Sequence, residues 1–129
     1  MDQEFRLELR LVIVPIESGD DERVLALTQQ STSAVGSIVD VDIKPYAKPP
    51  GSCIVRVEAN CTGSHQSVVE RVVGLVGGSG WDFSGSGEEF EAIWFPQSGA
   101  IPPVSVLTTW MQVQTIPMRA LPPSRRLRG

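Results

Sequence analysis

The sequence contains few of the side chains that perform catalysis. Its 129 residues include one histidine, His65, and two cysteines, Cys53 and Cys61. A structural zinc site needs four such ligands at close spacing, so we predict no metal site. A single histidine at the expected start of a helix is more often a solvent-exposed residue than a base. We therefore predict no catalytic residue, no cofactor and no enzymatic activity.

Glycine-rich and serine-rich motifs are present, but not in the setting that catalysis requires. Gly77–Gly80 follows a predicted helix and precedes a predicted strand, whereas a phosphate-binding loop needs the reverse order. Ser84–Gly87 lies between two predicted strands, whereas the nucleophile elbow of a hydrolase joins a strand to a helix. Both segments are predicted to be turns.

The chain also lacks an apolar run long enough to cross a bilayer, and its first residues are acidic. We therefore expect neither a membrane segment nor a signal peptide. Cys53 and Cys61 fall on one predicted strand at roughly 25 Å from each other, too far apart for a disulfide. Reduced, packed cysteines suit the cytoplasm, which is the predicted location.

Positive charge is scarce in most of the chain. Four of the eleven basic residues lie at or after Arg119, where there is no acid, so residues 1–118 carry seven bases against all fifteen acids. This body, with a net charge of −8, repels the phosphates of nucleic acid, and we predict no nucleic-acid partner. It suits simple solubility or a cationic protein partner.

The sequence does contain clear secondary-structure patterns. Alternation of apolar and polar residues predicts strands over residues 5–16, 37–43, 52–61, 80–83, 88–95 and 104–116. One helix is predicted before Gly36, with an apolar stripe of Val24, Leu27, Ser31, Ala34 and Val35. A second, valine-rich helix is predicted before Gly77, capped by Ser64 or by Ser67 in a capping box with Glu70.

This element order predicts an α+β fold of the ferredoxin-like split β-α-β type. Its β-α-β-β-α-β core is an antiparallel sheet with both helices on one face and one or two appended C-terminal strands. A cystatin-like or half-barrel arrangement is the alternative. Residues 1–117 form the predicted domain, and the proline- and arginine-rich residues 118–129 form a predicted mobile basic tail.

Paired acids and tryptophans supply the predicted partner-binding residues. Asp40 and Asp42 share the polar side of one predicted strand, and Glu89 and Glu91 share a side of another. Such pairs form a solvated surface, a patch for a basic partner or, when buried, an acid–base pair. Trp94 lies on a strand that is apolar on both sides, and we predict that Trp94 and Trp110 are interface anchors.

Several segments together resemble a known group of proteins. They are Pro45–Pro49, the valine-rich helix running into Gly80-Trp81, Glu91–Trp94 with its proline-rich loop, and Trp110. Over residues 40–115 the chain resembles small actinobacterial candidate immunity proteins encoded beside polymorphic-toxin genes. The resemblance implies a non-enzymatic cytoplasmic inhibitor that binds one toxin.

These observations favour a non-enzymatic protein-binding module, most concretely an immunity-type inhibitor of a basic toxin. The alternative is a small-molecule-binding or regulatory ferredoxin-like domain that acts as a homodimer through its sheets. A cofactor-free enzyme on a dimeric α+β barrel ranks third and would need His65 or a carboxylate in a cavity. A structural component of a larger assembly is the remaining alternative.

Overall fold

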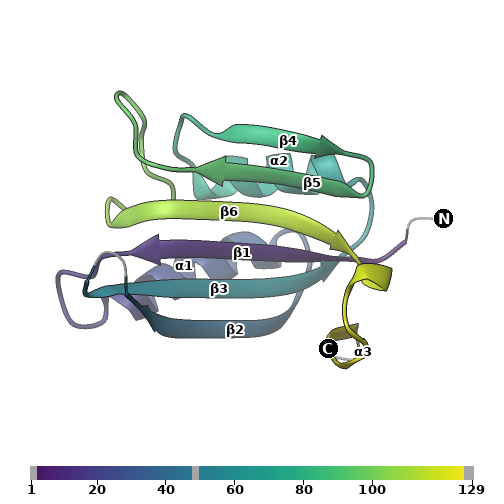
Figure 1. Cartoon of the computed structure of the whole chain (residues 1–129), viewed down its shortest axis with the longest axis horizontal. Coiled ribbons are helices and arrows are strands. Elements are labelled where there is room, and N and C mark those ends of the chain that lie inside the picture. The colour runs from purple at the N-terminus through teal and green to yellow at the C-terminus, as the bar shows by residue number, and fades with distance from the viewer. Residues whose placement is uncertain (1–2, 48–49, 127–129) are drawn as a thin grey trace.

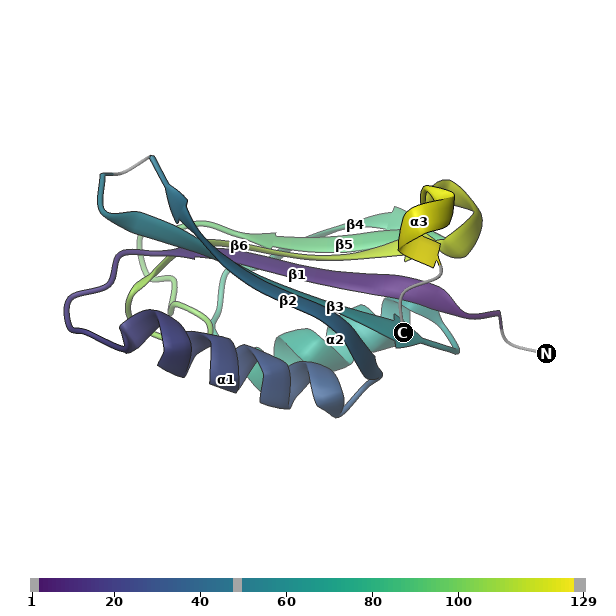
Figure 2. The same cartoon turned by 90° about the horizontal axis from the view of Figure 1, so that it is seen from below.

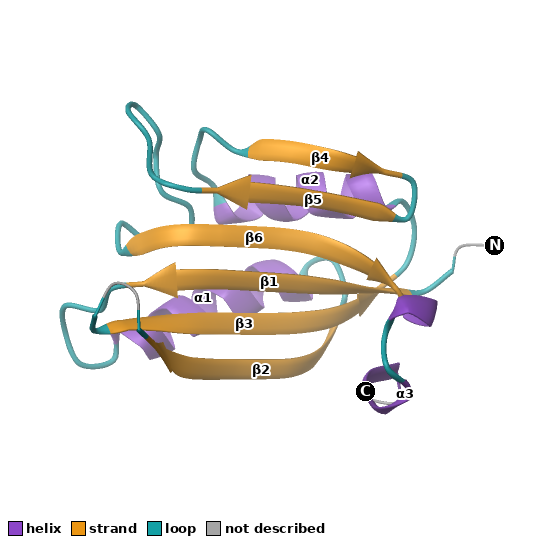
Figure 3. Ribbon diagram, in the orientation of Figure 1, coloured by secondary structure: helices purple, strands orange, loops and turns teal. Residues whose placement is uncertain are grey.

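The protein is built on one six-stranded antiparallel sheet. The computed structural model describes residues 3–47 and 50–126, and the strand order is β2-β3-β1-β6-β5-β4 (Figures 1 and 3). The strands are β1 (Phe5–Ile13), β2 (Ser37–Tyr46), β3 (Ser52–Cys61), β4 (Asp82–Ser86), β5 (Glu89–Trp94) and β6 (Thr108–Pro117). The predicted α+β class with an antiparallel sheet is confirmed.

Helices lie on both sides of this sheet, but unequally. The helices α1 (Asp20–Ser33) and α2 (His65–Val76) cover one face (Figure 2). On the other side, the helical segments among the described residues are a 3₁₀ turn, Met118–Ala120, and the short α3 (Pro123–Arg126), at one end of the sheet. We call the side opposite α1 and α2 the open face.

The strand order differs from the predicted one. The strand that follows α2 in sequence, β4, lies at the edge of the sheet, and the last strand, β6, lies beside β1. Burial explains why β6, and not β4, lies beside β1, because a central strand is covered by neighbours along its length. Every residue of the five-residue β4 is exposed, whereas β6 alternates buried and half-buried residues over ten positions and pairs along the whole of β1. The hairpin β4–β5 is therefore inserted before the last strand.

The core lies between the sheet and the two long helices. Leu7, Leu9 and Leu11 of β1 point into it and are fully buried. Their register partners on β3 and β6 point the same way, as antiparallel pairing requires. The strand residues that share this layer are Phe5, Ile13, Cys53, Val55, Ala59, Cys61, Ala92, Trp94, Met111 and Val113.

The helix α1 presents a different stripe from the predicted one. Its buried side is formed by Val24, Thr28 and Thr32, while Leu27 is half exposed. The two threonine hydroxyls donate to the carbonyls four residues earlier, Thr28 to Val24 at 2.8 Å and Thr32 to Thr28 at 2.7 Å. These bonds satisfy the hydroxyls without water, so weak helix formers can occupy the buried side.

The start and end of α2 follow local sequence signals. Ser64 caps the helix, and its hydroxyl accepts the amide of Ser67 at 3.2 Å, so the alternative of a capping box at Ser67 is wrong. Gly77, at a φ of 77°, ends the helix as predicted. Between α1 and β2 a β-carbon on Gly36 would lie 2.5 Å from the Asn60 carbonyl oxygen, so only glycine fits at this crossing.

Both cysteines are unpaired and buried, as the sequence predicts. They lie at opposite ends of β3 and face the helices. Burial raises the pKa of the Cys61 thiol to about 11. The thiol is therefore protonated and unreactive at neutral pH.

Candidate functional site

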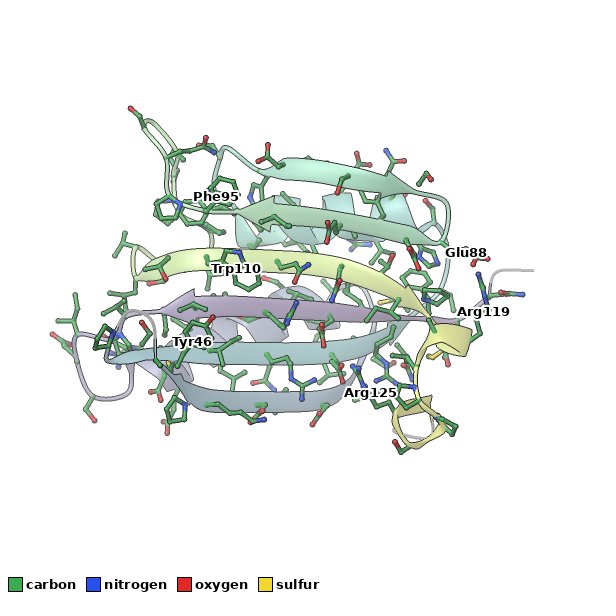
Figure 4. All side chains as sticks on the ribbon, in the orientation of Figure 1. Tyr46, Glu88, Phe95, Trp110, Arg119 and Arg125 are labelled. Carbon is green, nitrogen blue, oxygen red and sulfur yellow. The ribbon has the colours of Figure 1, made fainter. Side chains whose placement is uncertain are left out.

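The open face of the sheet gathers most of the predicted site residues. Residues Arg6, Glu8 and Arg10 of β1 point to this side, because they alternate with the core leucines. Their register neighbours on β3 are Asn60, Glu58 and Arg56. Figure 4 looks onto this face, with the aromatic residues at one end and Arg125 near the other.

The middle of the open face is an ion network of Arg6, Glu8, Arg56, Glu58 and Arg125. Arg6 contacts Glu58 at 3.4 Å, and the two side chains are only 0% and 1% exposed. Arg56 contacts Glu58 at 3.1 Å and Glu8 at 3.7 Å. Arg125 contacts both carboxylates, at 3.5 Å in the case of Glu8. Charges this deeply buried persist because each has an opposite charge and hydrogen bonds.

The C-terminal segment, residues 118–126, covers part of this network. Arg6 donates to the Arg125 carbonyl at 2.8 Å, and the Leu121 side chain of the segment is buried. The sequence predicts that residues 118–129 form a mobile tail; residues 127–129 lie outside the described part. Up to Arg126 the segment lies on the sheet, held by one apolar and several charged contacts, and its mobility stays a prediction.

One end of the open face carries an aromatic strip, which we define as Tyr46, Ile54, Phe95 and Trp110. Tyr46 and Phe95 are each 45% exposed, and Ile54 and Trp110 are half-buried. The three aromatic side chains come from different strands or strand ends and lie at the same end of the sheet (Figure 4). The Arg10 guanidinium lies 5.8 Å from the centre of the Trp110 ring, within the range of a cation–π contact.

The four predicted acids share the open face but do not form one patch. Asp40 and Asp42 lie on the edge strand β2, where they pair with Arg56 at 3.1 Å and Lys44 at 3.3 Å. Glu89 and Glu91 lie on β5, four strand spacings away, or roughly 19 Å. The first pair is neutralised by its neighbours. Of the four predicted acids, Glu89 and Glu91 lie outside this network of ion pairs.

Glu89 and Glu91 line a pocket of about 360 Å³ over β4, β5 and β6. Glu91 accepts hydrogen bonds from Gln112 at 2.9 Å and from Ser84 at 3.2 Å, which fix the direction of its carboxylate. Gln114 and Thr115 line the same pocket. A concave, carboxylate-lined site of this size can accept a cationic side chain.

The two predicted tryptophans lie on opposite sides of the sheet. Trp94 is 1% exposed, points toward the helices and donates to the Ser79 carbonyl at 2.8 Å. It is a core residue, so the expectation that it contacts a partner is wrong. Trp110 lies on the open face, where a partner can reach it. Tyr46 and Phe95 were not among the predicted site residues, although Phe95 shares the alternation of Glu91 and Ile93 and could have been found from it.

The single histidine lies at the other end of the sheet. The His65 ring stacks on Phe5 with centroids 3.8 Å apart, and its Nδ1 lies 2.7 Å from the Thr115 hydroxyl. Desolvation lowers its pKa, and nearby Glu88 opposes this shift. The ring is thus half-buried and neutral at pH 7, not simply solvent-exposed. It borders a cavity of about 840 Å³ that also contacts the Glu88–Arg119 ion pair.

Within residues 3–47 and 50–126, no group of three or more histidine, cysteine or acidic side chains is placed to hold a metal ion. In the same residues no helix has the length and apolar character needed to cross a membrane. The open face thus combines exposed aromatic side chains, a buried ion network and a carboxylate-lined pocket. Comparison with protein-family models, curated proteins and solved structures finds no match.

Proposed function

We propose that this chain is a non-enzymatic protein-binding module that docks a partner on its open face. The observation that carries the proposal is the aromatic strip, whose Tyr46 and Phe95 remain half exposed beside the Arg10–Trp110 contact. Tyrosine, tryptophan and arginine are the residues in which protein interfaces concentrate binding energy. Isolated exposed rings are common, but several in one strip favour a contact surface.

The loop between β5 and β6 also carries exposed apolar side chains. Ile101 and Val106, in the segment that joins β5 to β6, are among the most exposed large apolar side chains.

The charge distribution favours a basic partner. Residues 82–94, which we call the acidic hairpin, contain Asp82, Glu88, Glu89 and Glu91 and no basic residue. Opposite charge speeds association and selects partners. Together with the resemblance in sequence, this supports an immunity-type role, in which the chain inhibits a basic toxin in the cytoplasm.

The test is capture of a partner with a variant of the strip. We expect wild-type protein to retain a basic protein from the source cell that the double variant Tyr46→Ser/Phe95→Ser loses. Leu75→Ser is the matched control, because Leu75 is 49% exposed but lies on α2, on the other side of the sheet. Retention by all three proteins alike would refute a role for the strip.

The toxin assignment has a separate test. The captured protein is expressed alone and together with this chain, and growth is compared. An immunity role requires that the partner is toxic alone and harmless with wild-type protein. A harmless partner would leave a binding module and remove the immunity role.

A homodimeric regulatory or ligand-binding domain is the second candidate. The same aromatic strip favours it, because two copies could bury their strips against each other. Light scattering on a sizing column separates the candidates. A dimer that persists at low and high salt and is lost in Tyr46→Ser/Phe95→Ser would favour self-association, and a monomer would favour a foreign partner.

We infer, finally, that four of the strands form a ferredoxin-like core. Within the four strands β2-β3-β1-β6 all neighbours are antiparallel. The helix α1 connects β1 to β2, which lie on either side of β3. The helix α2 follows β3 and, past the acidic hairpin, leads to β6, and these two strands lie on either side of β1. Under this interpretation the acidic hairpin is an insertion between α2 and the last strand.

A further inference from the structure

The two edges of the sheet differ in how they are protected from pairing. The edge strand β2 carries Pro45, Lys44 and an irregularity between Ile38 and Asp40, all of which hinder the addition of another strand. The opposite edge, β4, contains neither proline nor lysine, although Gly85 within it has a φ of 105°, and it pairs only with β5 among the described strands. All five of its residues are exposed. The β4 edge therefore presents main-chain donors and acceptors to solvent.

We propose that β4 accepts an extended, basic segment of a protein partner as a seventh strand. The inference deepens the proposed function and rests on it, since it names how and where a basic partner docks. Main-chain hydrogen bonds along the edge supply affinity in this mode, and alternate side chains supply specificity.

The negative charge of the acidic hairpin determines which kind of segment can bind along β4. The acidic hairpin carries four carboxylates and no base of its own, and Arg119 pairs with one of them, Glu88. Pairing with the same hairpin of a second copy would bring the remaining like charges together. A strand with arginine or lysine at alternate positions has the complementary charge. Its side chains on the open face would lie opposite Asp82 and Ser84, which belong to that face through their pairing with Ile93 and Glu91.

The pocket beside the hairpin fits the same occupant. From the added strand, a long cationic side chain can reach diagonally toward Glu89 and Glu91, which line a cavity of about 360 Å³. Glu91 is already oriented by Ser84 and Gln112, so less ordering is needed when a guanidinium binds. Edge and pocket thus favour one ligand, an extended cationic strand.

The test uses a fluorescein-labelled heptapeptide of alternating arginine and threonine, with binding followed by fluorescence anisotropy. Two further peptides accompany it: one with glutamate in place of arginine, and one with alternate backbone amides N-methylated. The protein variant is Asp82→Lys/Glu89→Lys. Its matched control is Glu22→Lys/Glu70→Lys, two equally exposed acids on α1 and α2 that change the net charge by the same amount.

We expect the arginine peptide to bind wild-type protein and the control variant alike, and the Asp82→Lys/Glu89→Lys variant at least about tenfold more weakly. The glutamate and N-methylated peptides should not bind.

If the N-methylated peptide bound as tightly as the arginine peptide, strand addition would be overturned. If the control variant lost as much affinity for the arginine peptide as Asp82→Lys/Glu89→Lys, the assignment to β4 would be overturned. If the peptide fails while Tyr46→Ser/Phe95→Ser still abolishes partner capture, this inference is wrong and the proposed function stands. Failure of the arginine peptide to bind wild-type protein is by itself sufficient to overturn the proposal of strand addition.

Discussion

The two faces of the central strand β1 are both buried, but by different means. On the covered face Leu7, Leu9 and Leu11 pack against helices, whereas on the open face Arg6 and Glu8 are buried within an ion network. Apolar burial is favourable in itself, because it removes carbon from water. Burial of charge is unfavourable unless every partner is present. The covered face therefore stabilises the fold, and the open face depends on a particular arrangement of partners.

The largest effect is expected on the covered face. Leu9→Ala removes a fully buried side chain between Val57 and Val113 and should lower the free energy of unfolding by about 4 kcal/mol. Urea denaturation followed by tryptophan fluorescence measures the change, with the exposed Leu75→Ala as control. A loss smaller than that of the control would mean that the leucines do not form the central core.

A somewhat smaller loss is expected from the ion network. Glu58→Ala removes a buried carboxylate that Arg6, Arg56 and Arg125 contact and should destabilise the protein by about 3 kcal/mol. The double variant Arg6→Met/Glu58→Leu should recover part of this loss, because the uncompensated charge is removed as well. If the double variant is less stable than Glu58→Ala, the open face is stabilised by more than charge compensation.

The C-terminal segment should contribute less. Arg125 is one-third exposed, so Arg125→Ala should cost about 1 kcal/mol through the loss of its contacts with Glu8 and Glu58. Hydrogen exchange should show faster exchange in residues 118–126 and unchanged exchange in the helices. Arg71→Ala, on the exposed side of α2, is the control. Unchanged exchange in the segment would show that Leu121, not Arg125, holds it.

The smallest effect is a pH dependence at the His65 end of the sheet. Burial lowers the pKa of His65 below its usual 6.5, so the unfolded chain takes up this proton at higher pH than the folded protein. Stability should therefore decline as the pH falls through about 6.5 and stop declining below the folded-state pKa. His65→Gln should remove this part of the decline between pH 7.5 and 5 in urea titrations. An identical pH profile in the variant would show that the ring is not desolvated.

Much of the secondary structure followed from the sequence, because it depends on local patterns. Sequence patterns placed five strands close to their observed bounds, and the serine at position 64 and glycine at position 77 marked the ends of α2. The prediction for β4 was wrong in its bounds, because Ser84–Ser86, expected in a turn, belong to the strand Asp82–Ser86. The stripe of α1 was misjudged, because Thr28 and Thr32 satisfy their hydroxyls inside the helix and so behave as buried residues. Residue type alone did not reveal this.

The candidate site was only partly predictable. Alternation placed Asp40 with Asp42 on one side of their strand and Glu89 with Glu91 on one side of theirs, as observed, because period two is a property of the strand. It did not show that the two pairs lie on strands far apart in the sheet. Nor did it identify which apolar side of β5 faces the helices, and so Trp94 was taken for an interface residue.

The sequence by itself determined the elements, the acidic body and which residues share a side of each strand. Only the tertiary structure decided the order of the strands, because pairing depends on which strand is long and apolar enough to be covered by neighbours. It also decided which charges are compensated, since Arg56 and Arg125 reach acids that are distant in sequence. For these reasons Asp40 and Asp42 belong to a charge-compensated network, whereas Glu89 and Glu91 lie on the separate acidic hairpin.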